Sequence, residues 1–184
     1  MNRVTFITGN QFKAAFMAKF LDYPVEHQKI ELDEIQSLDL HKITEHKARQ
    51  AYELIKSPVL VEDIGLTIKA LGDLPGPLIK WFEEALGLQG ICDLVDNLGS
   101  REARAAVVFA YFDGLDINFF DGAVEGKIIK SSRGDDSFGW NSIFVRDGCG
   151  KTFAQMTDEE LKKYSLRTTT VFPEIKTFLE QLKK

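Results

Sequence analysis

Short apolar runs alternate along this chain with amphipathic segments of helical length. Strands are predicted for residues 3–8, 59–63, 103–112, 116–129 and 142–145, and an extended segment for residues 24–33. Helices are predicted for residues 11–22, 39–56, 78–86, 88–98 and from Ser165 onward, and a Thr157–Glu160 capping box opens a short helix before the last one. A chain that repeats strand and helix in this way is expected to fold as a mixed α/β protein.

Length and charge narrow the class of protein further. A chain of 184 residues suits a single domain, 1–184, with one or two lobes. The formal net charge is −5 and no basic run occurs, which argues against binding to nucleic acid or to a membrane surface. No apolar run approaches the roughly 18 residues of a membrane span. Cys92 and Cys149 show neither disulfide nor metal-ligand spacing, and the N-terminus shows no signal-peptide pattern, so a cytoplasmic protein is expected.

The predicted strand VLVED ends in two carboxylates, Glu62 and Asp63. Charged groups at the end of an apolar run cost free energy unless a positive partner meets them. In the helix predicted for residues 39–56, Lys47 falls on the same side as the apolar residues Leu40, Ile43, Ala51, Leu54 and Ile55. An inward lysine either binds a carboxylate or phosphate, or runs its aliphatic stem along the core in a structural role. We expect the first.

Two further segments carry groups suited to phosphate or metal. TGNQFK, residues 8–13, passes from a strand into a helix whose first N–H groups and dipole can hold an anion. Lys13 is unfavourable in that first turn unless an anion is present, and the alternative is an Asn10 cap beside a solvated lysine. Glu34 and Asp63 together suit Mg²⁺, whereas Glu34 alone would be a solvated loop acid. A divalent ion together with Lys47 is therefore the expected partner of the strand's carboxylates.

The segment SFGWNSIF, residues 137–144, places Phe138 and Trp140 on either side of Gly139. Aromatic rings that flank a glycine suit stacking on a flat ring, and Ser165 and Arg167 of KYSLR could reach a base edge or a phosphate. The alternative is two core aromatic residues and a surface arginine.

Taken in order, these segments resemble the inosine triphosphate pyrophosphatase family, which removes non-canonical purine nucleotides. The matching residues, from about Val4 to Arg167, are TGNQFK, KIELDEIQ, HKARQA, VLVEDIGL, ALGDLPGPLIKWF, FGWNSIF, DGCGKTFAQM and YSLR. The resemblance implies an elongated mixed sheet with two lobes, an active-site cleft between the lobes, and usually a homodimer. It also implies Mg²⁺-dependent hydrolysis of a purine nucleoside triphosphate to the monophosphate and pyrophosphate.

The same resemblance implies a role for each matching residue. Asp63 would be the base for the attacking water, Lys47 would neutralise phosphate charge, and Glu34 and Asp63 would hold the metal. The residues that would bind phosphates are Thr8, Gly9, Asn10 and Lys13. The residues that would contact the base are Phe138, Gly139, Trp140, Asn141, Ser165 and Arg167, with Phe138 stacking on the purine.

Three positions depart from the family pattern, all on the side that recognises the nucleotide. Asn141-Ser142 stands where the family has Asp-Pro, Leu166 where it has His, and Leu161 where it has Lys. The adjacent Lys162 replaces that lysine only if its helix turns by about 100°. Polar groups that hydrogen-bond to a base determine how strongly a site discriminates between bases. Because the residues on the metal and water side match the family, hydrolysis of (d)ITP and XTP is expected. The departures leave two alternatives: a shifted base preference, or a nucleotide-binding or sensing protein without turnover.

Overall fold

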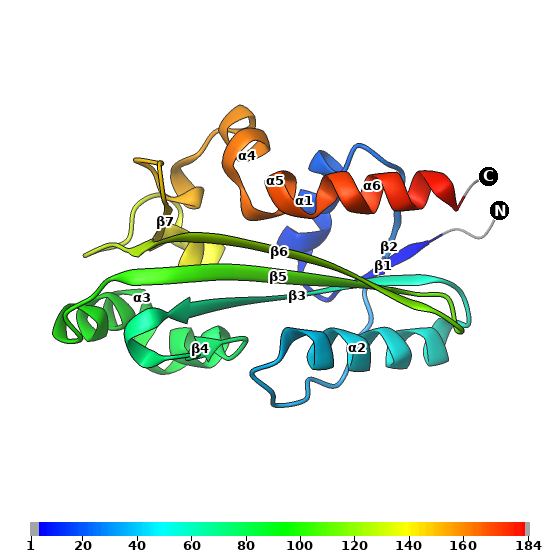
Figure 1. Ribbon diagram of the computed structural model, residues 1–184, viewed down its shortest axis with the longest axis horizontal. Coiled ribbons are helices and arrows are strands. Elements are labelled where there is room, and N and C mark those ends of the chain that lie inside the picture. The colour runs from blue at the N-terminus through cyan, green and yellow to red at the C-terminus, as the bar shows by residue number, and fades with distance from the viewer. Residues whose placement is uncertain (1–3, 183–184) are drawn as a thin grey trace. The chain divides into compact units, whose positions relative to one another are not determined.

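The computed structural model describes residues 4–182, except for the side chain of Phe138. Its strands are β1 (Thr5–Ile7), β2 (Glu26–Gln28), β3 (Val59–Ile68), β4 (Pro75–Gly76), β5 (Glu102–Phe112), β6 (Ile117–Ile128) and β7 (Phe144–Arg146). Its helices are α1 (Gln11–Phe20), α2 (Leu40–Ile55), α3 (Ile79–Asn97), α4 (Asp158–Tyr164), α5 (Leu166–Thr170) and α6 (Phe172–Gln181), with 3₁₀ turns at Lys69–Leu71, Asp136–Ser142 and Phe153–Gln155. The predicted mixed α/β class is confirmed (Figure 1).

The strands form a mixed sheet in the order β2-β1-β3-β5-β6-β7, and β4 pairs with β3. β1 runs parallel to β2 and β3, whereas the pairs β3–β4 and β6–β7 are antiparallel. The chain divides into two compact units, the first made of residues 1–63, 107–122 and 167–184 and the second of residues 64–106 and 123–166. That these units work as one domain with a cleft between them stays a prediction.

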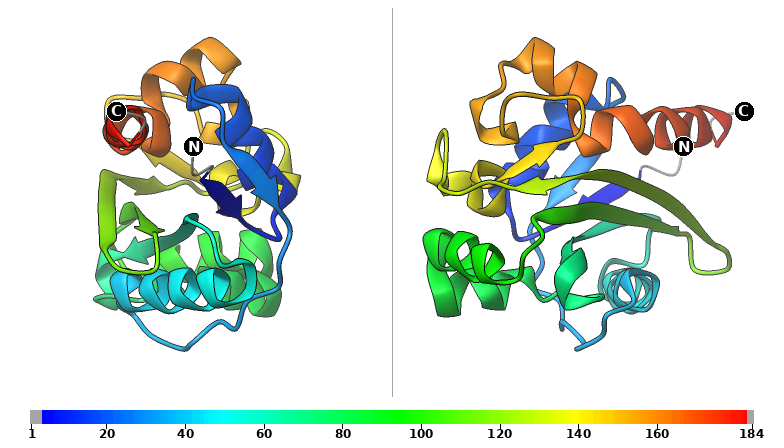
Figure 2. Two further views of the ribbon diagram at one scale, coloured as in Figure 1. Left: turned by 90° about the vertical axis from the view of Figure 1, so that its right-hand side faces the viewer. Right: turned by 60° about the vertical axis from the view of Figure 1, so that its left-hand side comes forward.

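In the first unit, helices cover both faces of the sheet (Figures 1 and 2). α2 packs against the face that carries Ile7, Val59, Val61, Ala110 and Phe112. α1 and α6 cover the other face, where the ring of Phe172 lies 6.1 Å from that of Phe16 and 6.0 Å from that of Phe109. Because successive strand residues point to opposite faces, neighbouring residues of β3 meet different helices.

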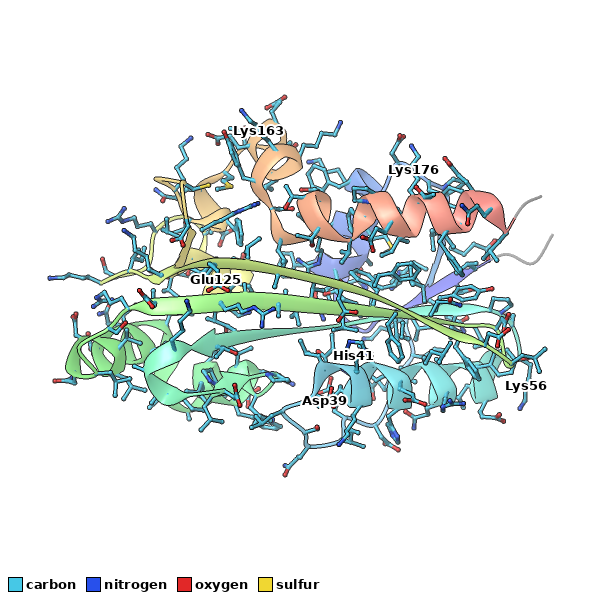
Figure 3. All side chains as sticks on the ribbon, viewed as in Figure 1. Asp39, His41, Lys56, Glu125, Lys163 and Lys176 are labelled. Carbon is cyan, nitrogen blue, oxygen red and sulfur yellow. The ribbon has the colours of Figure 1, made fainter. Side chains whose placement is uncertain are left out.

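Helix α2 carries the lysine that was expected to point inward. It begins after Asp39, whose side chain accepts hydrogen bonds from two backbone N–H groups, and ends before Lys56 (Figure 3). Its buried residues are Ile43, Thr44, Lys47, Ala48 and Ala51, so the inward direction of Lys47 is confirmed. The prediction for Leu54 is wrong, because it is 59% exposed. Leu54 lies in the last turn of α2, beyond the buried stretch that runs from Ile43 to Ala51.

Strand β3 is longer than predicted. The prediction ended it at Asp63, but it continues to Ile68, with Gly65, Leu66 and Ile68 buried. β4 pairs with this extension, and a Cβ at Gly65 would stand 2.8 Å from the backbone carbonyl carbon of Gly76, so only glycine permits this approach. Glu62 and Asp63 therefore lie within the strand instead of at its end, and their side chains leave from opposite faces.

The second unit contains the remaining predicted helices. α3 is interrupted at Gly87, whose φ of 67° breaks it into the two predicted helices. α4 begins with the predicted Thr157–Glu160 capping box, which is confirmed. Within residues 4–182, no helix combines the length and the apolar character needed to cross a membrane.

Candidate functional site

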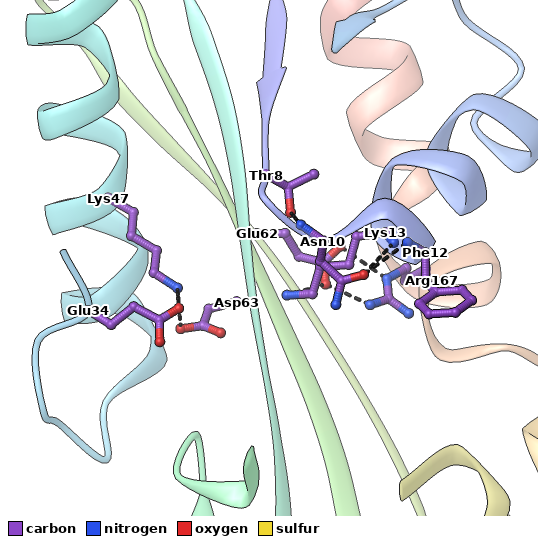
Figure 4. Close-up of polar contacts among 9 residues, drawn as sticks. All are labelled: Thr8, Asn10, Phe12, Lys13, Glu34, Lys47, Glu62, Asp63 and Arg167. Atoms are coloured by element: carbon purple, nitrogen blue, oxygen red, sulfur yellow. Dashed lines mark hydrogen bonds and ion pairs between the residues drawn. The ribbon is translucent and has the colours of Figure 1, made fainter. Parts of the chain in front are cut away.

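Lys47 contacts both carboxylates that were expected to hold a metal. Its Nζ lies 2.9 Å from Oε1 of Glu34 and 3.3 Å from Oδ2 of Asp63 (Figure 4). Burial acts to lower the pKa of Lys47, but Asp63 and then Glu34 outweigh it and hold that pKa above its ordinary value. The ammonium group is therefore charged at neutral pH. The expected convergence of these three side chains is confirmed, while their chemical roles stay predictions.

The donor set of this cluster suits a metal ion that also binds other oxygen atoms. Two carboxylates and one ammonium group leave a formal charge of −1, which favours a further cation. Over residues 4–182, no three side chains of His, Cys, Asp or Glu come together as a metal site. Mg²⁺ commonly takes one or two carboxylates and completes its shell with water and substrate phosphates. Glu34 and Asp63 fit a metal bound in that manner.

Glu62 lies on the opposite face of β3, where it binds two cations. Its side chain is 1% exposed, and its Oε1 lies 2.6 Å from Nη2 of Arg167 and 3.3 Å from Nζ of Lys13. Nε of Arg167 donates a second hydrogen bond to Oε2 over 3.1 Å. Burial acts to raise the pKa of Glu62, but Arg167 and then Lys13 hold it at about 2. The prediction that a divalent ion and Lys47 meet both strand carboxylates is therefore wrong for Glu62.

The cluster of Lys13, Glu62 and Arg167 was missed by the sequence analysis, although a signal for it was available. Strand alternation alone separates Glu62 from Asp63, so a different partner for each acid follows from their adjacency. With two cations and one carboxylate, the cluster has a formal charge of +1. The guanidinium carbon of Arg167 also lies 5.4 Å from the centre of the Phe16 ring, in cation–π range. Clusters of opposite formal charge thus flank one strand (Figure 4).

We expect the protein to lose stability as the pH falls from about 4.5 to about 2, because Glu62 titrates there. A carboxyl group with a lowered pKa stabilises the fold above its unfolded pKa, and this contribution disappears as pH falls through the folded value. The shift corresponds to roughly 3 kcal/mol. Urea denaturation at pH values from 6 to 2 measures it. The Glu62→Gln variant should show a flatter profile, and an equally steep one would contradict the assignment.

The turn before α1 is capped by its own side chains. Oγ1 of Thr8 accepts a hydrogen bond from the N–H of Asn10, and Oδ1 of Asn10 accepts from the N–H groups of Phe12 and Lys13 over 2.9 and 3.2 Å. The expectation of unoccupied N–H groups in this first turn is therefore wrong for Phe12 and Lys13. The alternative of an Asn10 cap is confirmed, but Lys13 is paired with Glu62 instead of being solvated. Gly9 and Asn10 are exposed.

The aromatic motif expected at the base lies in the second unit, and the side chain of Phe138 falls outside the described part of the chain. Trp140 is buried at 7% exposure and packs edge-on against Phe144, so for Trp140 the core alternative is confirmed. Its backbone N–H donates to Oε1 of Glu83 over 2.7 Å. Gly139 has a φ of 59°, and a Cβ there would meet the Glu83 carboxylate at 3.0 Å. Glycine therefore lets the chain turn against this glutamate.

The other predicted base-side residues occupy two kinds of environment. Asn141 is half-buried, and Ser165 is buried at the end of α4. α4 turns Leu161 partly inward and leaves Lys162 exposed, and the use of Lys162 in place of the missing family lysine stays a prediction. Leu166 is 2% exposed, which explains why an apolar side chain is tolerated there. A direct contact of these residues with a base stays a prediction.

Comparisons with known proteins point to one family. Residues 4–172 match the model of the Ham1 family. Inosine triphosphate pyrophosphatase 2 of Trypanosoma cruzi (strain CL Brener) is 44% identical over 170 residues, covering 90% of this chain and 87% of that protein. Inosine triphosphate pyrophosphatase of Scheffersomyces stipitis is 36% identical over 194 residues, covering 97% of this chain and 98% of that protein.

Solved structures agree with these sequence matches at the level of the fold. A HAM1 protein from Coxiella burnetii superposes with a TM-score of 0.81 and 23% sequence identity, covering 98% of this chain and 100% of that chain. At such low identity the likeness shows a shared fold.

Proposed function

This chain belongs to the Ham1 family, and we propose that it is a nucleoside triphosphate pyrophosphatase that hydrolyses non-canonical purine nucleotides, (d)ITP and XTP, to the monophosphate and pyrophosphate. The observation that carries the proposal is the position of Lys47, whose buried ammonium group touches carboxylates from two separate segments. The names of the curated relatives, which are inosine triphosphate pyrophosphatases, support the same substrate class.

The charges around β3 support binding of a triphosphate with a metal ion. The cluster of Lys13, Glu62 and Arg167 has a formal charge of +1 and favours phosphate oxygens, which carry negative charge. On the other face, Glu34 and Asp63 would hold Mg²⁺. When bound, this ion would screen phosphate charge and polarise phosphorus–oxygen bonds. Thr8, Gly9, Asn10 and Lys13 would bind the phosphate chain.

Asp63 is the proposed base. In the reaction a water oxygen bonds to the α-phosphorus, and the water proton goes to Asp63. The anhydride bond between the α- and β-phosphates breaks, and pyrophosphate leaves. Lys47 keeps its charge next to Asp63 and offsets the negative charge that develops on the phosphate oxygens. Because such transfers depend mainly on placing charge and water, the position of these two side chains contributes directly to the rate.

The base side of the site is proposed to contain Phe138, Gly139, Trp140, Asn141, Lys162, Ser165 and Arg167. In this group Trp140 acts from the core, where its ring packs edge-on against that of Phe144. Asn141 can donate a hydrogen bond where an aspartate could only accept one, and the buried Leu166 offers no polar contact. These two residues favour a second candidate, a pyrophosphatase of the same mechanism with a shifted base preference.

A panel of nucleotides tests the proposal. ITP, dITP, XTP, ATP, GTP, CTP and UTP, and the deoxy forms of the last four, are incubated with Mg²⁺, and the release of pyrophosphate and monophosphate is measured. We expect kcat/KM to be highest for ITP, dITP or XTP. A maximum for another nucleotide supports the shifted preference. No pyrophosphate from any of them, together with measurable nucleotide binding, would identify a binding or sensing protein and overturn the proposal.

Two expectations from the family resemblance are part of the proposal. We expect a homodimer, which light scattering with size-exclusion chromatography measures as twice the chain mass of 20.8 kDa. We also expect the protein to lie in the cytoplasm, where nucleotides of the cellular pool would be its substrates.

A further inference from the structure

Glu34 is held by a segment that has no helix or strand of its own. Residues 29–39 connect β2 to α2 as irregular backbone, and the Glu34 side chain is 60% exposed. Ion pairs with an exposed partner contribute little to stability, because solvent screens them and the side chains lose conformational freedom. The ion pair with Lys47 therefore does little to hold Glu34 in place. The position of Glu34 depends on how the main chain beside it is held.

Gln50 holds the residue immediately before Glu34 at two points. Its Oε1 accepts a hydrogen bond from the backbone N–H of Asp33 over 2.8 Å, and its Nε2 donates to Oδ2 of Asp33 over 2.9 Å. Only a side chain with one acceptor and one donor at its end can make both bonds, and an amide has this combination. Asp33 is thereby fixed in both its backbone and its side chain.

Lys47 and Gln50 are three residues apart in α2, so they lie on neighbouring turns of one helix face. The adjacent residues Asp33 and Glu34 meet this face in register, Asp33 on Gln50 and Glu34 on Lys47. We propose that Gln50 is a positioning residue that docks the 29–39 segment on α2 and so places the Glu34 carboxylate for the metal and phosphates. This inference rests on the proposed pyrophosphatase function and deepens it.

The Gln50→Glu variant tests the inference, because Glu keeps the shape and the acceptor but loses the donor and repels the Asp33 carboxylate. We expect the Mg²⁺ concentration for half-maximal rate and the KM to rise about tenfold, the effect of one lost hydrogen bond, with a smaller change in kcat. Hydrogen exchange of the 29–39 segment, measured without metal or nucleotide, should become faster. The melting temperature should stay near that of the wild type, because Gln50 lies only half-buried.

Rescue and control variants separate docking from a general charge effect. In the double variant Asp33→Asn with Gln50→Glu, the new amide donates to the new carboxylate, so exchange, KM and metal requirement should return toward wild type. Asp33→Asn alone should be near wild type, since its Oδ1 still accepts from Gln50. Gln36→Glu adds the same charge at an exposed position of the 29–39 segment, and should leave all three quantities unchanged.

The outcomes for Gln50 and for the proposed function can be told apart. Faster exchange with unchanged KM and metal requirement in Gln50→Glu, or no rescue in the double variant, overturns the positioning role while the function stands. A wild type without turnover overturns the function, and the affinity of each variant for Mg²⁺–ITP, measured by calorimetry, then judges Gln50. Equal affinity in the wild type and Gln50→Glu, or no binding by either, overturns the positioning role as well.

Discussion

The Asp63→Asn variant is expected to lose turnover by about 10²–10⁴-fold in kcat, the usual contribution of a positioned base. An amide is not basic enough to accept the proton of the attacking water. Its Oδ1 still accepts a hydrogen bond, so the 3.3 Å contact with Lys47 can persist and the fold should be retained. Pyrophosphate release measures the rate, and calorimetry with ITP and Mg²⁺ measures an affinity that should change far less.

A matched control for this variant is Asp22→Asn. Asp22 is exposed and pairs with Lys176, so the control also removes one carboxylate from a lysine, without touching the Lys47 cluster. Its kcat should equal that of the wild type. If Asp63→Asn keeps wild-type kcat, Asp63 is not the base. If the wild type binds nucleotide without turning it over, the protein is a binder or sensor.

The Arg167→Met variant is expected to lose about 3–5 kcal/mol of unfolding free energy, the usual cost of breaking a buried ion pair from one side. Arg167 makes two hydrogen bonds to a carboxylate that is 1% exposed, and without it Lys13, at 3.3 Å, is the cation left beside Glu62 among residues 4–182. The stem of methionine replaces most of the packing of the arginine stem. The loss therefore reports the charge that is left buried, and urea denaturation at pH 7 measures it.

The pH dependence distinguishes this electrostatic cause from lost packing. In the variant the pKa of Glu62 rises, so less stability is lost between pH 4.5 and pH 2 and the two proteins should converge at low pH. A deficit that stays constant with pH would assign the effect to packing. Arg49→Met is the control, because Arg49 forms an exposed pair with Glu45 on one helix, worth only about 0.3–0.5 kcal/mol.

Helical and strand periods in the sequence were enough to predict the α/β class and the inward direction of Lys47. Both follow from local geometry, since the direction of a side chain in a helix depends only on its position in the repeat. The caps of α1 and α4 were predictable for the same reason, because Asn10 and Thr157 bond to N–H groups two or three residues away. The meeting of Glu34, Lys47 and Asp63 was expected from the need of an inward lysine for an anionic partner.

Other features depend on segments that are far apart in the chain. Arg167 reaches Glu62 across 105 residues, and no local pattern states which helix covers which face of β3. The extension of β3 to Ile68 depends on β4, and the exposure of Leu54 depends on how much of the length of α2 the sheet covers. Local periods set the direction of each side chain, whereas long-range packing selects its partner, because only packing brings distant segments within a few ångströms.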